Sequence, residues 1–294
     1  MRQVTVLAPA KLNLTLDVVG LEPNGYHSLD MIMQTIDLYE QITLRKSSDL
    51  RLRLPGSRVP ANDSNTAIKA ALAFFHYTGL LAGVDMEIRK GVPVRAGMAG
   101  GSADAAGVLV GLNALYDARL SFSELWSLAA GIGADVPFAL LGGTARVKGV
   151  GDVMKALPPC PDCWFTVCMP AVGVSTPKAF ARYDEIGSSV HPDGEAAEQA
   201  VRAGNLDALA AQMKNALEES SESRHNEPIR RILDENGALA SLMTGSGAAV
   251  FGVFRTEQQA QAAAQALRGQ YRQVYVQRPC PGGARVVPAF RHHR

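Results

Sequence analysis

A glycine-rich segment is the strongest chemical signal in this chain of 294 residues. Residues 93–107 read Pro-Val-Arg-Ala-Gly-Met-Ala-Gly-Gly-Ser-Ala-Asp-Ala-Ala-Gly. Glycines let backbone N–H groups turn toward a ligand, and the helix that follows adds unpaired N–H groups and the positive end of its dipole. The segment therefore predicts an anion cradle suited to phosphates, to which the Ser102 hydroxyl would add a phosphate or Mg²⁺ contact. A tight turn that only packs a helix on a sheet explains the glycines equally well.

The order of these glycines excludes two common nucleotide-binding motifs. A Walker A loop requires Gly-x-x-x-x-Gly-Lys-Ser/Thr, which does not occur in the chain. A dinucleotide-binding loop requires Gly-x-Gly-x-x-Gly between a strand and a helix, and the segment does not have that order. A phosphate cradle at this position would therefore be of another type.

Two further glycine-containing segments favour the phosphate interpretation. Thr244-Gly245-Ser246-Gly247 precedes a predicted strand and could bring backbone amides to the same ligand, although a tight turn is the simpler explanation. Gly133-Ala134-Asp135-Val136-Pro137 places Asp135 at the start of a short helix, where the helix dipole stabilises its charged form. An ordinary N-cap is the commoner role for such an aspartate.

Polar and aromatic side chains near the N-terminus could complete a site. Lys11 and Asn13 lie on one face of a predicted strand, opposite two leucines, and could line a cleft or belong to a solvated face. Asn24-Gly25-Tyr26-His27 is a turn signal that sets an aromatic ring beside an imidazole. Such a pair could stack on and hydrogen-bond a base, or could be a core tyrosine beside a surface histidine.

The hydrophobic periodicity predicts an α+β chain that would position these residues. In the first half it predicts strands at 12–18, 42–44, 50–54 and 84–88 and helices from about 65, at 102–116 and after the capping box Ser121/Glu124. In the second half it predicts strands at 164–169, 248–254 and a final one at 274–276, with helices at 194–203, 205–219, 227–236 and 257–269. Thr176 is the expected N-cap of one more helix, and Thr256 with Gln259 a second capping box. The prolines of 158–161 predict a boundary, with domains at 1–158 and 159–294.

Composition excludes several classes of protein. The 29 basic and 28 acidic side chains leave a formal charge of +1, so no basic face for nucleic acid is expected. No apolar run approaches the roughly 18 residues of a membrane span. The first residues open directly into strand-like sequence with no signal or transit peptide, which predicts a cytoplasmic protein.

The four cysteines do not form a disulfide framework. Cys160 and Cys163 have Cys-x-x-Cys spacing, but a structural zinc site would need a second ligand pair that none of the six histidines supplies. Reduced thiols in a proline-rich linker are the expected state of this pair.

The motifs, taken in order, resemble the GHMP small-molecule kinase superfamily over nearly the whole chain. The segments that carry the resemblance are Pro9-Ala10-Lys11-Leu12-Asn13-Leu14, Asn24-Gly25-Tyr26-His27-Ser28-Leu29, the loop of 96–106, Gly133-Ala134-Asp135-Val136-Pro137 and Thr244-Gly245-Ser246-Gly247. The first two are similar to the branch that acts on a cytidyl-carrying methylerythritol. The resemblance implies a ribosomal-protein-like N-terminal domain, a ferredoxin-like C-terminal domain and an active site in the cleft between them.

The same resemblance implies an ATP-dependent kinase of the non-mevalonate isoprenoid pathway, which phosphorylates the 2-hydroxyl of that substrate with ATP and Mg²⁺. Asp135 would accept or orient the hydroxyl proton, and Lys11 would keep Asp135 ionised and stabilise charge in transit. The implied substrate-binding residues are Asn13, Tyr26, His27, Thr176 and Phe180. The implied ATP-binding residues are Asn65, Lys90, Pro93, Gly97, Met98, Ala99, Gly100, Gly101, Ser102 and Ala103, supported by Gly245, Ser246 and Gly247.

Two other functions are compatible with parts of the pattern. One is a GHMP kinase for another alcohol, of the mevalonate or homoserine type. The other is a non-catalytic nucleotide- or RNA-binding module, which the near-neutral charge and the intact Lys11 and Asp135 disfavour. Val94-Arg95 stands where some relatives carry glycines, which leaves the path of the loop open. A monomer or weak homodimer is the expected state.

Overall fold

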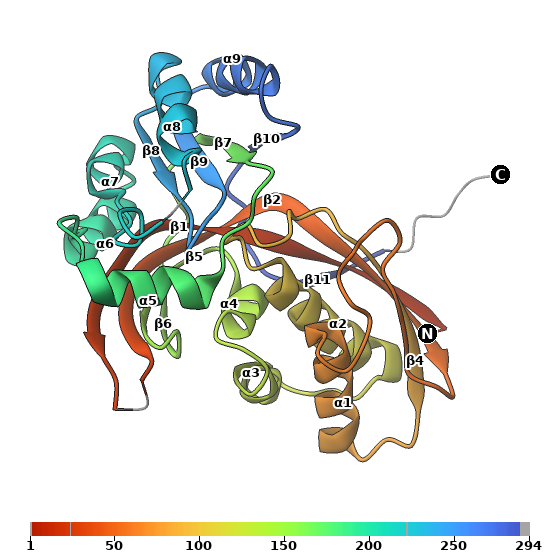
Figure 1. Ribbon diagram of the computed structural model, residues 1–294. Coiled ribbons are helices and arrows are strands. Elements are labelled where there is room, and N and C mark those ends of the chain that lie inside the picture. The colour runs from red at the N-terminus through yellow and green to blue at the C-terminus, as the bar shows by residue number, and fades with distance from the viewer. Residues whose placement is uncertain (1, 24, 222, 289–294) are drawn as a thin grey trace.

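Two long antiparallel strands run through the centre of the molecule (Figure 1). They are β1 (Gln3–Leu21) and β2 (His27–Ser47), joined by a short turn. The computed structural model describes residues 2–23, 25–221 and 223–288, so Asn24 of the expected turn lies outside it. The middle of β1 is buried on both faces, because the two halves of the chain pack against opposite sides of it.

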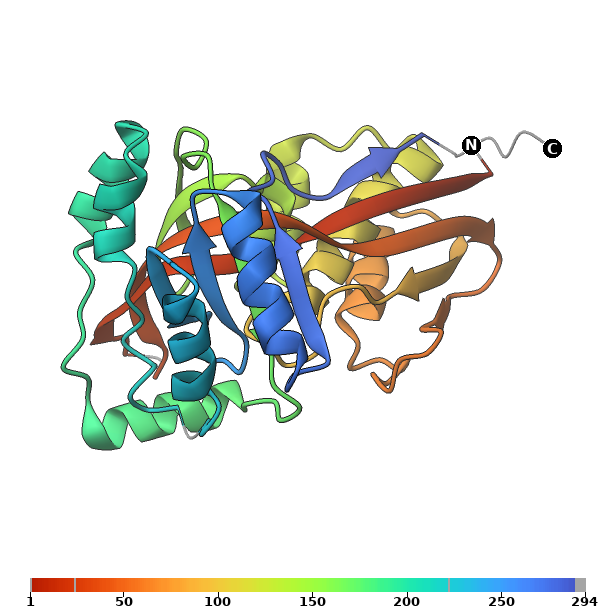
Figure 2. The ribbon, with the colours of Figure 1, turned by 90° about the horizontal axis from the view of Figure 1, so that it is seen from above.

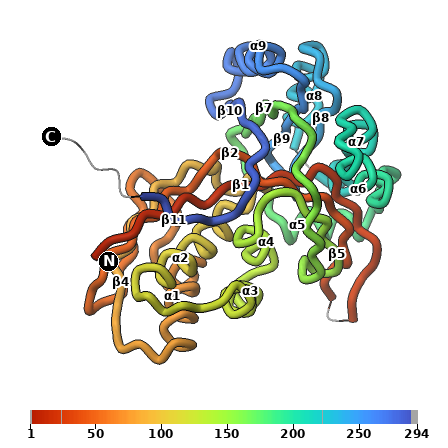
Figure 3. The backbone as a smooth tube through the Cα atoms, turned by 180° about the vertical axis from the view of Figure 1, so that it is seen from behind, coloured from red at the N-terminus to blue at the C-terminus, as the bar shows by residue number. Residues whose placement is uncertain are grey.

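The first sheet has seven strands, and β2 is the central strand with which β1, β4 and β5 pair. One edge of β2 pairs with β1, while the other pairs with β5 over 29–34 and with β4 over 41–47. The end of the described chain returns to this sheet, since β11 pairs with β1 (Figure 3). The other members of the sheet are β3 (Arg51–Arg53), β4 (Gly83–Arg89), β5 (Thr144–Gly149), β6 (Val153–Ala156) and β11 (Arg285–Val287).

Four helices cover one face of this sheet below the long strands in Figure 1. They are α1 (Thr66–Thr78), α2 (Gly100–Tyr116), α3 (Phe122–Ala130) and α4 (Val136–Leu141). Small residues let α2 lie close to the sheet, because a Cβ at Gly107 would stand 2.6 Å from the Ile42 side chain. This packing fixes the direction in which the N-terminus of α2 points.

The second sheet is antiparallel, in the order β10 (Gln273–Gln277), β7 (Trp164–Met169), β9 (Val250–Phe254) and β8 (Ala240–Met243). Seen from above, α8 (Asn226–Glu235) and α9 (Glu257–Arg268) lie over it (Figure 2). Phe165 and Phe251 of this sheet belong to the same buried cluster as Leu12 and Leu14 of β1. Three more helices flank the sheet: α5 (Thr176–Ile186), α6 (Gly194–Arg202) and α7 (Leu206–Gln212).

Most predicted elements are confirmed, including the complete capping box of Ser121 and Glu124. The box at Thr256 is half formed, since its hydroxyl accepts from the Gln259 backbone but also donates to the Gln259 side chain. The N-cap of α5 is Ser175, so the prediction of Thr176 was wrong by one residue. The strand at 274–276 is not the last, because β11 follows it.

The helix predicted over 205–219 was wrong in extent, because α7 ends at Gln212. The next residues bridge to β1, where the Leu16 N–H donates to the Lys214 carbonyl and the Ala216 N–H donates to the Leu16 carbonyl. The Asn215 amide then donates to the carbonyls of Met243 and Gly245, each at 2.8 Å. Pairing with a distant strand has replaced the local helical bonds.

The proline-rich segment of 158–161 lies between β6 of the first sheet and β7 of the second. The division into domains 1–158 and 159–294 stays a prediction, and β11 shows that the chain rejoins the first sheet after leaving the second. All four cysteines are free and buried. Within the described ranges, none of the helices has the length and apolar character needed to cross a lipid bilayer.

Candidate active site

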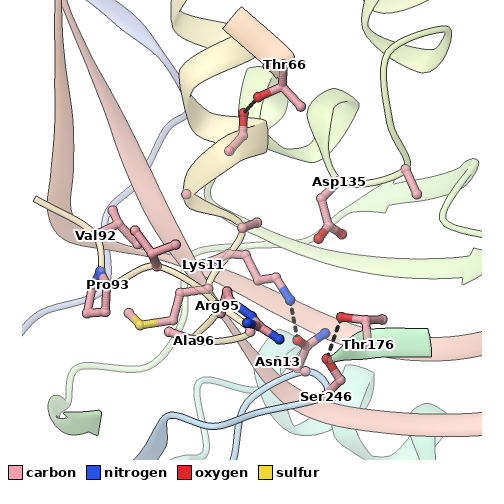
Figure 4. Close-up of a pocket in the computed structure, with 18 of the residues that line it drawn as sticks. Lys11, Asn13, Thr66, Val92, Pro93, Arg95, Ala96, Asp135, Thr176 and Ser246 are labelled. Atoms are coloured by element: carbon pink, nitrogen blue, oxygen red, sulfur yellow. Dashed lines mark hydrogen bonds between the residues drawn. The ribbon is translucent and has the colours of Figure 1, made fainter. Parts of the chain in front are cut away.

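A cleft of about 540 Å³ brings together most of the side chains singled out in the sequence (Figure 4). Its walls come from β1, the glycine-rich loop, the starts of α2 and α4, the first turns of α5 and the turn between β8 and β9. The predicted residues that line it are Lys11, Asn13, Asn65, Lys90, Pro93, Gly97, Met98, Ala99, Gly100, Gly101, Asp135, Thr176, Phe180, Gly245 and Ser246.

Five predicted residues do not line this cleft: Tyr26, His27, Ser102, Ala103 and Gly247. Ala103 is buried in the core between α2 and the sheet, because its position in the first turn of α2 faces inward. Ser102 is half-buried on that same turn. A Cβ at Gly247 would meet Met243 and Val174, so this residue faces the protein interior.

Lys11 and Asn13 form the floor of the cleft. Lys11 is 6% exposed and Asn13 0%, so the alternative of a solvated strand face is wrong. The Lys11 ammonium donates to Oδ1 of Asn13 at 2.5 Å, and the Asn13 backbone N–H donates to Oγ1 of Thr244 at 3.0 Å. Burial lowers the pKa of Lys11, while attraction to the Asp135 carboxylate opposes that lowering. Two residues on the same face of β1 thus place a cation and an amide in the cleft.

Asp135 lies across the Lys11 ammonium from Asn13 (Figure 4). It occupies the N-cap position of α4, but its side chain makes no capping hydrogen bond. The simpler interpretation, an aspartate whose role is to cap the helix, is therefore wrong. No described residue donates a hydrogen bond to this carboxylate, which leaves it able to accept one from a ligand hydroxyl.

The glycine-rich loop is held between β1 and the turn that precedes β9. The Lys11 N–H donates to the Met98 carbonyl at 3.2 Å, and the Ala249 N–H donates to the Ala96 carbonyl at 3.2 Å. Gly97 has φ of +74°, and a Cβ there would overlap the Thr244 carbonyl. The two glycine-containing segments therefore touch, as the sequence suggested. Each needs its glycines because the two backbones lie so close together.

The N-terminus of α2 opens into the cleft next to this loop. Its N-cap residue, Ala99, has a left-handed conformation and cannot cap the helix with a side chain. Gly100 and Gly101, the first residues of α2, line the cleft. An uncapped helix N-terminus that follows a glycine-rich loop and opens into a cleft is a geometry suited to phosphate groups. The glycines of this segment therefore allow two backbones to pack closely and also leave the N-terminus of α2 open to an anion.

The sequence patterns did not predict the buried cluster of charged side chains at the edge of the cleft. The Lys90 ammonium lies 2.5 Å from Oε1 of Glu40 and 2.5 Å from Oδ2 of Asp104, and Glu40 also accepts from the Gly91 N–H at 2.9 Å. Burial raises the pKa of Glu40 to about 7 and that of Asp104 to about 6, although Lys90 opposes both increases. Burial also acts to lower the pKa of Lys90, but the two carboxylates raise it overall. No sequence signal identifies Glu40, because only the packing of β2 under α2 buries it.

Asn65 lines the cleft while serving as the N-cap of α1. Its Oδ1 accepts from the Ala67 N–H at 2.9 Å and its Nδ2 donates to the Pro60 carbonyl at 2.8 Å. The neighbouring Thr66 hydroxyl donates to the Gly101 carbonyl at 2.7 Å, a contact drawn in Figure 4. Asn65 therefore fixes the wall beside the start of α2 and keeps limited hydrogen-bonding capacity for a ligand.

Phe180 connects the cleft to the predicted aromatic pair. The Phe180 ring lines the cleft and stacks on the His27 ring, with centroids 4.6 Å apart and 25° between the ring planes. Nε2 of His27 is 2.7 Å from a carboxylate oxygen of Asp184, which orients the imidazole. Tyr26 is 67% exposed at the hairpin turn. In this arrangement His27 occupies one face of Phe180.

The cleft fits a divalent metal held mainly by ligand phosphates. Of its two lining carboxylates, Asp104 is paired with Lys90 and Asp135 has no hydrogen-bond donor in the described structure. No cluster of three or more metal-binding side chains occurs among the described residues. Mg²⁺ typically uses one or two carboxylates together with substrate phosphates, which this donor set allows.

Comparison with known proteins supports the same class of site. Residues 65–143 match the family model for the GHMP kinase N-terminal domain, and residues 197–273 match that for the GHMP kinase C-terminal region. A crystal structure of a homoserine kinase from Cytophaga hutchinsonii superposes with a TM-score of 0.78 over 98% of each chain, at 18% identity. Fold and site thus define a GHMP-type small-molecule kinase.

More similar relatives identify the branch. The 4-diphosphocytidyl-2-C-methyl-D-erythritol kinase of Carboxydothermus hydrogenoformans is 39% identical over 97% of this chain and 96% of its own, and that of Alkaliphilus metalliredigens 38% over 94% and 96%. A crystal structure of a 4-(cytidine 5'-diphospho)-2C-methyl-D-erythritol kinase has a TM-score of 0.79, with 32% identity over 95% of this chain and 99% of that one. The chain belongs to the 4-diphosphocytidyl-2-C-methyl-D-erythritol kinase family.

Proposed function

We propose that this chain transfers the γ-phosphoryl group of ATP to the 2-hydroxyl of 4-diphosphocytidyl-2-C-methyl-D-erythritol, giving the 2-phosphate and ADP. The observation that carries the proposal is the meeting of Lys11, Asn13 and Asp135 opposite the glycine-rich loop and the open N-terminus of α2. One wall suits the phosphates of the donor, and the other presents the groups that an acceptor hydroxyl needs. Membership of the family supports the identity of the acceptor.

The chemistry follows from this arrangement. The 2-oxygen forms a bond to the γ-phosphorus while the bond to the β,γ-bridging oxygen breaks, and its electron pair leaves with ADP. The hydroxyl proton passes to a carboxylate oxygen of Asp135, or is oriented by it until transfer is complete. Lys11 stabilises the charge that develops on the phosphoryl oxygens, and Asn13 holds Lys11 in place. Phosphoryl transfer depends mainly on such positioning and charge stabilisation.

The donor nucleotide would bind along the opposite wall. Residues 97–101 would hold its phosphates, while Lys90 and Asn65 stand where its nucleoside part would lie. Mg²⁺ would be held by those phosphates with Asp135 nearby, and it would neutralise charge on them. Ser102 follows residues 97–101 on the first turn of α2 and is half-buried without lining the cleft, so its contact with phosphate or Mg²⁺ stays a prediction from the sequence.

The cytidyl end of the acceptor would bind near Phe180. The cleft face of this ring is available for stacking on cytosine, with Thr176 and Ser246 alongside, their hydroxyl oxygens 2.8 Å apart. Tyr26 and His27 come from the neighbouring hairpin and would close over the base. Binding energy from this remote anchor would orient the small polyol at Asp135.

The proposal is tested by ATP consumption with 4-diphosphocytidyl-2-C-methyl-D-erythritol, with mevalonate and with homoserine, each as sole acceptor. We expect turnover with the cytidyl substrate only, and ³¹P NMR should place the new phosphate on the 2-oxygen. Turnover of mevalonate or homoserine at an equal or higher rate would assign the chain to another kinase of the superfamily. The cytoplasmic location, the monomeric or weakly dimeric state and the absence of nucleic-acid partners stay predictions from the sequence.

A further inference from the structure

Arg95 is a charged residue of the cleft that the proposed reaction does not yet use. It lines the cleft from the first part of the glycine-rich loop, and Figure 4 shows its guanidinium on the cleft side, directed toward Asn13. No dashed line in Figure 4 reaches Arg95, although one joins Lys11 to Asn13. Among the described residues, none accepts a hydrogen bond from this guanidinium, so its donors can face a ligand.

The other cations among the described lining residues already have partners in the protein. The Lys11 ammonium donates to Asn13 and lies opposite the Asp135 carboxylate. The Lys90 ammonium lies 2.5 Å from each of two buried carboxylates. The acceptor of the proposed reaction adds the two negative charges of its diphosphate to those of the ATP phosphates. Arg95 is the described cation of the cleft that is best placed to neutralise this additional charge.

The backbone of Arg95 has an unfavourable conformation for a residue with a side chain. Its φ is +58°, in the left-handed region that glycine adopts freely and that costs other residues free energy. Residues held in such conformations are frequent at ligand-binding sites. A Cβ at Gly173 would stand 2.8 Å from the Cβ of Arg95 and 3.6 Å from its Cδ. The stem of Arg95 therefore packs against a glycine, which restricts where the guanidinium can lie.

The position of Arg95 favours a contact with the acceptor over a contact with ATP. Gly173, against which Arg95 packs, lies shortly before α5, and α5 carries Phe180, the proposed cytosine contact. The proposed cradle for the ATP phosphates, residues 97–101, lies at the end of the loop that leads into α2. A ligand with its cytosine on Phe180 and its 2-hydroxyl at Asp135 must carry its diphosphate between these two residues.

We propose that Arg95 binds the diphosphate of the cytidyl acceptor and so contributes to the choice of acceptor. The inference rests on the proposed function, which supplies the positions of the cytosine and of the reacting hydroxyl. A guanidinium presents paired N–H donors that match phosphate oxygens and stays charged throughout the physiological pH range. Acceptors without a diphosphate, such as mevalonate and homoserine, would gain no binding energy from this contact.

Calorimetric titration with cytidine diphosphate and with cytidine tests the phosphate contact. It compares the wild type with Arg95→Gly, which suits the left-handed backbone, and with Arg95→Gln, which keeps a polar side chain but removes the charge. We expect both variants to bind cytidine diphosphate about tenfold or more weakly, and cytidine as the wild type does. The thermal unfolding midpoint of Arg95→Gly should not fall, because glycine adopts a φ of +58° more readily.

Arg119 offers a matched control for these variants. It is a second arginine with a left-handed backbone, with φ of +55°, but it is exposed and pairs with Asp117 at 3.0 Å. It does not line the cleft. Arg119→Gly and Arg119→Gln should therefore bind cytidine diphosphate and cytidine as the wild type does.

A titration with ADP distinguishes the two diphosphates that the cleft would hold. Both variants of Arg95 should bind ADP as tightly as the wild type does. The proposal is overturned if they bind cytidine diphosphate as tightly as the wild type, or if the loss is equally large for cytidine or for ADP. Failure of the proposed function would appear instead as absence of turnover with the cytidyl substrate, which the assay of the three acceptors measures independently of these titrations.

Discussion

The Lys11 ammonium donates a 2.5 Å hydrogen bond to the side chain of Asn13, two positions along the same face of β1. Both residues are buried, and the Asn13 backbone N–H is bound in turn by Thr244 from the second half of the chain. The cation at the floor of the cleft is therefore positioned by both halves together. A substitution that disturbs either half will therefore change the position of the Lys11 ammonium.

Asn13→Ala should lower the free energy of unfolding by about 1–3 kcal/mol, because it leaves the buried Lys11 ammonium without its acceptor. The double variant Lys11→Met/Asn13→Ala should recover part of this loss, since it removes the unpaired charge as well. Urea unfolding of the two single variants and the double variant measures the coupling. Strict additivity of the two changes would show that the hydrogen bond contributes nothing.

Asp135→Asn should lower kcat by about 10²–10⁴-fold, because it removes the group that we propose accepts or orients the hydroxyl proton. Thermal stability should change little, since the carboxylate makes no capping bond. Asp234→Asn, an exposed position on α8, serves as the control. A variant at Asp135 with near-wild-type turnover would remove this residue from the mechanism.

Phe180→Ala should raise the KM for the cytidyl substrate by about tenfold or more, because stacking of a base on an aromatic ring contributes roughly 1–3 kcal/mol. Tyr26→Ala should act in the same direction. Neither change should alter the KM for ATP, because we propose that ATP binds on the opposite wall. Initial-rate measurements with each substrate varied in turn would check this, and an equal loss of ATP affinity would contradict the cytidyl role.

Glu40 should make stability depend on pH near neutrality. The unfolded chain releases this proton near the ordinary value of 4.5, whereas burial raises the pKa of Glu40 to about 7 in the folded protein. Between these values the folded state binds more protons, so the free energy of unfolding should fall as pH rises, by up to about 3 kcal/mol. Glu40→Gln should flatten that part of the profile, and the exposed Glu257→Gln should not. Identical slopes in the wild type and Glu40→Gln would contradict the assignment.

Gly97→Ala should abolish most activity and destabilise the protein by several times the cost of Gly79→Ala. Both glycines have positive φ, +74° and +67°, so each substitution carries a backbone cost of roughly 1–2 kcal/mol. Only at Gly97 would the new Cβ overlap another backbone, that of Thr244, while Gly79 has open space. Denaturation midpoints and initial rates compare the pair. Equal effects would mean that the loop can move away from Thr244 at no cost.

Local patterns predicted the elements that depend on neighbours in the sequence. The capping box at Ser121, the helix that begins near Asn65 and the strand over 12–18 are confirmed, because each prediction rests on residues a few positions apart. The prediction of a helix over 205–219 was wrong beyond Gln212, because the Asn215 side chain hydrogen-bonds to a backbone carbonyl in another part of the fold. The fold class and the family were also readable, since the motifs of the family lie in short continuous segments.

The buried cluster of Glu40, Lys90 and Asp104 was beyond the reach of sequence reasoning. Glu40 is one of three acidic residues of β2, and nothing near it in the sequence predicts 0% exposure. Its burial depends on α2 lying close to the sheet, which Gly107 allows.

The sequence by itself determined which groups are available for chemistry: a lysine and an asparagine in one strand, an aspartate at a helix start and glycines that leave backbone amides free. The tertiary structure decided that they meet, that Asp135 is not used as a cap, and that Ser102 and His27 stand outside the cleft lining. The reason is physical. Residue type and local spacing set hydrogen-bonding capacity and backbone freedom. The burial of a side chain, its direction and its distance from remote segments depend instead on how the helices of the first half and the second sheet pack against β1.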